Sequence, residues 1–192
     1  MNLPKAIELM KRREEEILSS LLSLSEKTKG FTDPELVMIG GYALRAFIPF
    51  SRFTRDCDFA IVKGNGWNID RIKGFLPEGY LVEEEQKRND YGFLRCVKFV
   101  KHNRTRVKVS IDFMEGEIRG REAKEVIKID EAMIKSRAFV SIPIAGEPIK
   151  LPIPSYVDYF IMKVVSARAS DIRDIAALIC ENGIPENLVR KS

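Results

Sequence analysis

Residues 37–62 read VMIGGYALRAFIPFSRFTRDCDFAIV. A short apolar run, Leu36–Ile39, ends in the pair Gly40-Gly41, and a segment of helical character, Tyr42–Phe47, follows until Pro49 breaks it. A buried strand that ends in two glycines can turn with positive φ and leaves no Cβ in the way of a ligand. The first N–H groups of the following helix lack partners and attract anions. This order therefore predicts a phosphate site.

Two carboxylates follow at the start of the next apolar run. Asp56 and Asp58 flank Cys57 and lead into Phe59–Val62. Residues two apart on a strand project from one face, so the carboxylates lie together, and Cys57 is expected on the opposite, apolar face. Paired carboxylates suit Mg²⁺, which also binds substrate phosphates. Each feature alone is more often a turn or a solvated strand end, but together they favour a site that holds a nucleoside triphosphate through its metal.

The same residues resemble a known motif. GGYAL at 40–44 and RFTRDCDF at 52–59 resemble the first motif of the DNA polymerase β-like nucleotidyltransferase superfamily. More narrowly they are similar to the AbiEii-type toxins of abortive-infection and toxin–antitoxin systems, whose pattern is roughly G-G-[ST]-A-L followed by R-x-S-x-D-x-D-F. Tyr42 stands where Ser or Thr is usual, whereas Thr54 keeps the hydroxyl of the usual Ser. The resemblance implies that Arg52 and Thr54 contact the nucleotide.

A third carboxylate lies in a predicted hairpin. Strands Phe93–Lys101 and Arg106–Phe113 are joined through residues 102–105, and the second strand alternates cleanly. If it pairs beside the Asp-x-Asp strand, Asp112 joins the site; otherwise Asp112 is an edge-strand aspartate. Nucleotidyl transfer uses two metals about 3.5–4 Å apart, which takes more than two carboxylates, and the third can accept a proton. Lys108 shares the face of Asp112 and is nominated as a phosphate contact.

The resemblance continues into the C-terminal part of the chain. The spacing of four residues is similar to the AbiEii-type pattern K-x(n)-R-x-K-D-x-x-D-L, with Ser170 where Lys is common: Lys163, Arg168, Asp171 and Asp174. By resemblance, Lys163 binds triphosphate oxygens, and Asp171 or Asp174 completes the site or orients the lysine. The alternative is that the two aspartates cap a helix and carry surface charge. For Lys163 function is favoured, because an unpaired buried lysine is costly.

Composition limits the class of protein. The chain has 192 residues, of which 45% are hydrophobic and 31% charged, as in globular proteins with a substantial core. No apolar run approaches a membrane span and residues 1–16 lack a signal-peptide core, so no membrane association is expected. Cys57, Cys96 and Cys180 are widely spaced without CxxC, which favours a reducing cytoplasm over disulfides or zinc. The net charge of +4 is compatible with an RNA or nucleotide substrate.

Local patterns predict the remaining elements. Apolar residues recur at helical spacing over Leu3–Lys27, which predicts one amphipathic helix. Ser155 is a good N-cap for a helix that contains Lys163, and a further helix starts near Asp171. Residues 115–128 are expected to be charged and irregular. Shorter helices are predicted at 69–75 and 130–136, and further strands at 80–84, 138–142 and 147–151.

Patterns and resemblance together imply an α/β (α+β) nucleotidyltransferase fold. A mixed sheet flanked by helices is expected over residues 1–151, and a helical C-terminal region, residues 152–192, is expected to pack on this core. The expected reaction is Mg²⁺-dependent transfer of a nucleoside monophosphate from a nucleoside triphosphate to an acceptor hydroxyl. The expected ligands of two Mg²⁺ ions are Asp56, Asp58 and Asp112. These three aspartates and Lys163, which would neutralise phosphate charge, are the expected catalytic residues. The expected nucleotide contacts are Gly40, Gly41, Arg52, Thr54, Lys108, Arg168, Asp171 and Asp174.

The resemblance also implies partners. It indicates a toxin that acts on a tRNA end or a protein and is held in check by an antitoxin protein encoded beside it. Two alternatives stay open: a non-catalytic module that binds nucleotide for regulation, and an antibiotic-modifying nucleotidyltransferase. His102, the only histidine, falls in the predicted hairpin turn, so a histidine triad or zinc hydrolase is hard to build.

Overall fold

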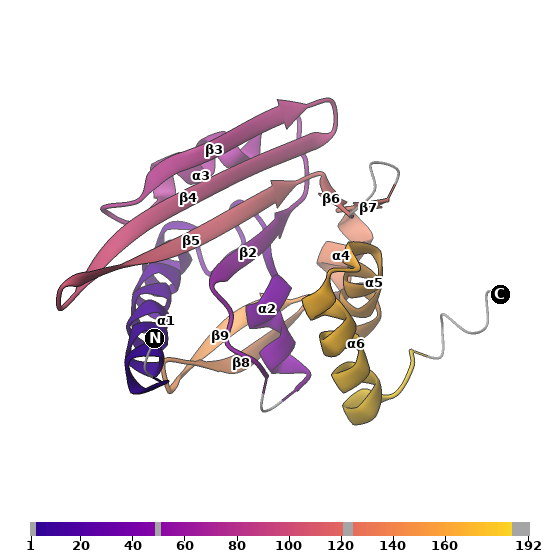
Figure 1. The fold of residues 1–192 in the computed structure, drawn as a ribbon. Helices are drawn as coiled ribbons and strands as arrows, with labels where there is room; N and C mark the ends of the chain where they lie inside the picture. The colour runs from indigo at the N-terminus through magenta and orange to yellow at the C-terminus, as the bar shows by residue number, and fades with distance from the viewer. Residues whose placement is uncertain (1–2, 49–50, 121–124, 186–192) are drawn as a thin grey trace.

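A five-stranded sheet forms the centre of the computed structural model, which describes residues 3–48, 51–120 and 125–185 (Figure 1). Its strands are β1 Leu36–Ile39, β2 Asp56–Ile61, β3 Leu81–Arg88, β4 Tyr91–His102 and β5 Thr105–Glu115. The strand order is β1-β2-β5-β4-β3, in which β2 and β5 are parallel and the other neighbours antiparallel. The predicted mixed sheet and the hairpin of β4 and β5 are therefore confirmed.

Helices and two small hairpins surround this sheet. The hairpin strands are β6 Glu117–Arg119 with β7 Val126–Lys128, and β8 Ala138–Ile144 with β9 Glu147–Ile153. The helices are α1 Leu3–Lys27, α2 Gly40–Ala43, α3 Asn68–Phe75, α4 Glu131–Ser136, α5 Tyr156–Ser166 and α6 Ala169–Asn182. Helices α5 and α6 lie side by side, on the side of the molecule away from α1 (Figure 1). No helix in these three described ranges is long and apolar enough to cross a membrane.

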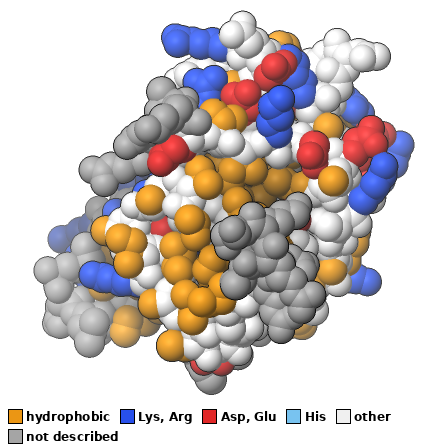
Figure 2. Space-filling model, turned by 90° about the vertical axis from the view of Figure 1, so that its right-hand side faces the viewer, with side chains coloured by type: hydrophobic (Ala, Val, Ile, Leu, Met, Phe, Trp, Pro, Cys, Tyr) orange, Lys and Arg blue, Asp and Glu red, His pale blue; other side chains and the backbone are white. Residues whose placement is uncertain are grey.

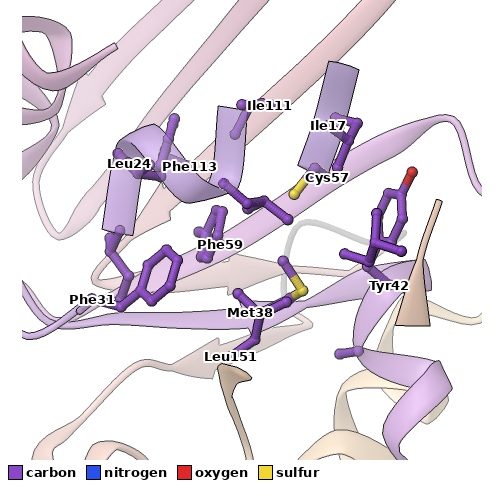
Figure 3. Packing of buried hydrophobic residues seen from close by; sticks show 14 of the residues in the cluster. Ile17, Leu24, Phe31, Met38, Tyr42, Cys57, Phe59, Ile111, Phe113 and Leu151 are labelled. Carbon is purple, nitrogen blue, oxygen red and sulfur yellow. The ribbon is translucent and has the colours of Figure 1, made fainter. Parts of the chain in front are cut away.

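One face of the sheet carries the main hydrophobic core (Figure 3). The Phe59 ring lies between those of Phe31 and Phe113, with centroid distances of 5.9 and 5.6 Å. Helix α1 covers this face with fully buried side chains, each contributing roughly 1.5–3 kcal/mol by burial: Ile17, Leu21 and Leu24. Cys57 is also fully buried here, as its place between two outward-facing aspartates predicts.

The opposite face of the sheet is partly covered by a smaller apolar cluster. Val37 and Ile39 of β1 pack there with Met133 of α4 and Met162 of α5. This cluster fixes α5 against the sheet and leaves the rest of the face open to polar residues. Figure 2 views the molecule from the side of α4, α5 and α6, and shows hydrophobic side chains gathered on that surface. The exposed large apolar side chains of α5 and α6 are Val164, Ile172 and Ile179.

The structure corrects the predicted helix after the glycines. Helix α2 begins at Gly40 rather than Tyr42, is one turn long, and continues as a 3₁₀ turn, Leu44–Ala46. So short a helix is not stable by propensity, because nucleation outweighs the few hydrogen bonds gained. Burial of Tyr42, Ala43 and Leu44 holds it instead. The expected break at Pro49 lies outside the described residues.

Two further segments differ from prediction. Strand β3 runs beyond residues 80–84 to Arg88, because a charged edge strand hides the alternation that a half-buried strand shows. Within residues 115–128, expected to be irregular, β6 and β7 form a hairpin. Glu115 ends β5 and is fully buried, where its carboxylate accepts hydrogen bonds of 2.9 Å from the backbone N–H groups of Asn68 and Ile69 at the start of α3.

Candidate functional site

Three aspartates meet on the open face of the sheet. Strand β2 runs parallel to β5, and Asp58 is the register partner of Asp112. Asp56 lies two residues before Asp58 on the same face, with Ser110 as its partner on β5. All three aspartates line one cavity of about 450 Å³. The pairing that places Asp112 beside the Asp-x-Asp strand is therefore present.

Asp58 is a carboxyl group without a direct partner in the described part of the chain. Among the described residues it has no hydrogen-bond or ion-pair partner, and burial, reinforced by Asp112 and Asp56, raises its pKa to about 7. Arg168 and Lys163 oppose this shift without cancelling it. Asp56 differs, because its Oδ1 accepts a hydrogen bond of 2.6 Å from the Ser110 hydroxyl. A carboxylate held ionised in this position requires a cation beside it.

Arg95 of β4 holds the third aspartate. Its Nε donates to Asp112 Oδ1 at 3.0 Å and its Nη2 to Oδ2 at 2.5 Å, a bidentate pair. Burial raises the pKa of Asp112, although the hydrogen bonds from Arg95 oppose that rise. Arg95 is not among the residues predicted from the sequence. The predicted hairpin could have indicated it, because counting back along both strands from the pair His102 and Thr105 places Arg95 opposite Asp112.

The two glycines allow the backbone to approach the carboxylates. Gly40 has φ +67°, and a Cβ there would overlap the Asp58 carboxylate. A Cβ on Gly41 would lie 2.5 Å from the Thr54 hydroxyl oxygen. The Tyr159 hydroxyl of α5 donates to the Gly40 carbonyl at 2.7 Å and fixes this turn. Because α2 has a single turn, its helix dipole is weak, and the role of the glycines in this structure is to let the backbone pack against Asp58 and Thr54.

Gly40→Ala is expected to disrupt the site. The positive φ and the overlap with Asp58 together should lower the free energy of unfolding by on the order of 3 kcal/mol. They should also abolish binding of Mn²⁺, which serves as a probe for the expected Mg²⁺ site. Gly146 in the turn between β8 and β9 is a matched control, because its φ is +85° but nothing lies near its Cβ position. Gly146→Ala should cost about 1 kcal/mol and leave Mn²⁺ binding intact. Urea unfolding and Mn²⁺ titration measure both effects; equal behaviour of the two variants would contradict the assignment.

Helices α5 and α6 contribute a buried network of charges. Lys163 Nζ donates to Asp171 Oδ1 and to Asp174 Oδ2, both at 2.8 Å. Arg52 makes a bidentate pair with Asp174, with distances of 2.9 and 3.0 Å. Burial raises the pKa of Asp174, but the hydrogen bonds from Arg52 and Lys163 outweigh it and leave that pKa below its ordinary value. The network ties the segment before β2 to both helices and neutralises the lysine.

Other predicted residues have mixed placements. Arg52, Thr54, Arg168, Lys163 and Asp171 line the cavity with the glycines. Arg168 and the unpredicted Arg55 line it without an ion-pair partner in the described parts of the chain, which leaves both cations available to phosphate.

Lys108 and Tyr42 lie outside the cavity. Lys108 does not line the cavity; its Nζ pairs with Glu83 on β3 at 2.6 Å, four residues along β5 from Asp112. The nominated phosphate contact therefore has no support. Tyr42 points into the core (Figure 3), and its buried hydroxyl has no hydrogen-bond partner among the described residues. It cannot replace the small hydroxyl usual at that position, and the guanidinium of Arg45 lies over its ring instead.

The donor set fits a divalent cation. Hard carboxylate oxygens of Asp56 and Asp58 face the cavity, and Asp58 lacks a neutralising partner. Within the described ranges, however, no three acidic, cysteine or histidine side chains are gathered as a ready-made metal site. Arg95 occupies both oxygens of Asp112. Coordination of a metal ion by all three aspartates therefore requires Arg95 to release at least one oxygen of Asp112 or to share that oxygen with the metal.

Arg95→Met is expected to tighten Mn²⁺ binding roughly tenfold, because it frees both oxygens of Asp112. Without metal, the buried carboxylate loses its partner, so the free energy of unfolding should fall by on the order of 2 kcal/mol. Saturating Mn²⁺ should restore it. Isothermal titration and urea unfolding with and without Mn²⁺ measure these effects. Weaker Mn²⁺ binding in the variant would instead show that Arg95 orients Asp112 for the metal.

Comparison with solved structures shows the same fold. The crystal structure of JHP933 from Helicobacter pylori superposes with a TM-score of 0.55 at 16% sequence identity, covering 94% of this chain and 72% of that one. A second crystal structure, of a "putative nucleotidyltransferase from H. pylori", gives a TM-score of 0.51 at 15% identity, covering 93% and 72%. No curated protein matches the chain.

The family model that matches this chain is that of a nucleotidyl transferase, so the class of protein is a nucleotidyltransferase. The family model described as "Nucleotidyl transferase AbiEii toxin, Type IV TA system" matches residues 22–191. The chain therefore belongs to the AbiEii family of nucleotidyltransferase toxins.

Proposed function

We propose that this protein transfers a nucleoside monophosphate from a nucleoside triphosphate to an acceptor hydroxyl in a Mg²⁺-dependent reaction. The uncompensated carboxylate of Asp58 carries the proposal, because it lies against the Gly40 turn and is the register partner of Asp112. A negative charge without a partner in this partly closed site is unfavourable unless a cation lies beside it.

Each group has a separate role in this reaction. Asp56 and Asp58 would hold Mg²⁺, which would neutralise phosphate charge and lower the pKa of the acceptor hydroxyl. The acceptor oxygen bonds to the α-phosphorus as the bond to pyrophosphate breaks, and Asp112 accepts the hydroxyl proton on an oxygen that Arg95 releases. Lys163 and Arg168 bind the triphosphate oxygens. We assign α5 and α6 to the same catalytic unit, since α5 supplies Lys163; residues 186–192 of the expected region 152–192 lie outside the described residues.

The biological setting follows the family. We propose that the chain is the toxin of a toxin–antitoxin pair, acts in the cytoplasm on a tRNA end or a protein, and is controlled by a cognate antitoxin. The AbiEii match supports this proposal. The mild positive charge of +4 is compatible with a nucleic-acid acceptor.

A transfer assay tests the reaction. The protein is incubated with each of the four α-³²P-labelled nucleoside triphosphates and Mg²⁺, with total tRNA, a protein extract or an aminoglycoside as acceptor. We expect label on a macromolecular acceptor and its loss when EDTA is added. Nucleotide binding without transfer to any acceptor would instead favour the non-catalytic module, and label on the aminoglycoside would favour an antibiotic-modifying enzyme.

A further inference from the structure

An aromatic wall on β4 lines the cavity beside the carboxylates. Tyr91 and Phe93 lie two residues apart on one face of the strand and both line the cavity. Their rings are nearly parallel, at 4°, with centroids 6.5 Å apart. Arg95 follows on the same face, and its guanidinium carbon lies 5.3 Å from the Phe93 centroid. Phe93 is only 8% exposed, so the accessible ring of this wall is Tyr91, which lines the same cavity as the Arg95–Asp112 pair.

Arginines extend this wall with further planar and positive groups. The guanidinium of Arg119 lies over the Tyr91 ring, 3.9 Å from its centroid. One face of this guanidinium contacts the ring, and its other face can take a second planar group. Arg88 is the cross-strand neighbour of Tyr91 on β3, is exposed, and has no ion-pair partner in the described part of the chain. Arg119 also pairs with Glu117 at 3.6 Å, so among the described residues the unpaired positive charge next to the wall is that of Arg88.

The position of the wall separates it from the triphosphate groups. In the order β1-β2-β5-β4, the Gly40 turn follows β1, and Lys163 comes from α5, which packs on β1 through the smaller cluster. Asp112 on β5 lies between these groups and the wall on β4. If the triphosphate lies against Gly40 and Lys163, an acceptor hydroxyl must reach the α-phosphorus from the Asp112 side. It then passes over Tyr91 and Phe93.

We infer that Tyr91 and Arg119, backed by the buried Phe93 ring, form a stacking subsite for the terminal base of a single-stranded polynucleotide acceptor. This inference rests on the proposed function, because it assumes the direction from which the acceptor hydroxyl reaches the triphosphate. Aromatic rings and guanidinium planes stack on nucleobases, and nearby arginines bind the strand phosphates. A cationic aminoglycoside has no aromatic ring to stack on Tyr91 and would be repelled by Arg88, which is unpaired within the described ranges. A protein hydroxyl would make no use of an aromatic ring and a guanidinium plane.

A pair of probes tests the subsite without catalysis. Fluorescence anisotropy measures binding of a 5′-fluorescein 12-nucleotide single-stranded RNA, and of the same strand with an abasic 3′-terminal nucleotide, without nucleoside triphosphate. The wild-type protein should bind the intact strand roughly 5- to 100-fold more tightly than the abasic strand. Tyr91→Leu should bind both strands equally weakly, whereas Tyr91→Phe should keep the preference.

Phe99→Leu is the matched control. Phe99 is an exposed aromatic side chain on the same strand, outside the cavity, so its loss should leave the preference unchanged. Equal wild-type binding of the two strands, or an intact preference in Tyr91→Leu, would overturn the inference. So would a Tyr91→Leu variant that loses affinity for ATP or GTP while keeping the strand preference.

The proposed reaction can fail separately. If the wild-type protein transfers no label to any acceptor but shows a Tyr91-dependent preference for the intact strand, the stacking subsite stands and the reaction does not. If label is transferred but the two strands bind equally, the reaction stands and the subsite is wrong.

Discussion

Asp58→Asn is expected to lower the rate of nucleoside monophosphate transfer by roughly 10³-fold or more. The amide cannot supply the negative charge that the proposed metal and phosphates require. The same substitution should stabilise the protein at neutral pH in the absence of metal, because it removes a partly desolvated charge with no partner among the described residues. Loss of activity combined with gain of stability distinguishes a charge kept for function from one kept for the fold.

The pH dependence of this stability has a definite sign. The ordinary pKa is 3.8 and the folded value about 7, so between those values the folded state binds more protons than the unfolded state. The Asp58 contribution to the free energy of unfolding therefore falls as pH rises from 4 to 7. We expect this loss to be on the order of 2 kcal/mol, since the side chain is partly open to the cavity. Asp58→Asn should remove it.

Urea unfolding at pH 5 and pH 8 in EDTA measures this slope, and a transfer assay measures the rate. Asp90→Asn is the control, because Asp90 is exposed and outside the cavity. It should change neither the rate nor the slope. Transfer that survives in Asp58→Asn would remove Asp58 from the metal site, and a wild-type slope in that variant would contradict its raised pKa.

Lys163→Met is expected to destabilise the fold by about 3–5 kcal/mol. Its ammonium group is the partner of both Asp171 and Asp174, all three side chains are almost fully buried, and an orphaned buried charge is costly. In this variant Asp174 still has its ion pair with Arg52, so most of the lost stability comes from Asp171, which is left without a partner for its charge among the described residues. Urea unfolding at pH 7 measures the change. A loss below about 1 kcal/mol would mean that the network contributes little to the fold.

A second substitution separates the structural role of Lys163 from its proposed role with phosphate. Lys163→Met combined with Asp171→Asn removes one charge of each sign and should recover roughly half of the lost stability. We expect this double variant to fold yet bind nucleoside triphosphate at least tenfold more weakly. Asp171→Asn alone serves as the control. Wild-type nucleotide affinity in the folded double variant would show that Lys163 only orders the helices.

Much of the fold could be predicted where the pattern is local. The long apolar periodicity of α1 gives its bounds, Leu3–Lys27, and Ser155 caps α5 as predicted, accepting from the Asp158 N–H. Clean alternation placed Asp112 on the polar face of β5. The helix after the glycines was less predictable, because a single turn held by packing has no period to detect.

The sequence by itself determined which groups are present and which face of each strand they occupy: two carboxylates on β2, one on β5, and a diglycine turn before them. Side-chain alternation is a property of every strand, so these assignments need no knowledge of the partner strands. Only the tertiary structure decided that β5 lies parallel to β2 with Asp58 opposite Asp112. It also decided that the Ser110 hydroxyl donates to Asp56 and the Tyr159 hydroxyl to the Gly40 carbonyl. These contacts join segments 54 and 119 residues apart, where no local pattern records the register.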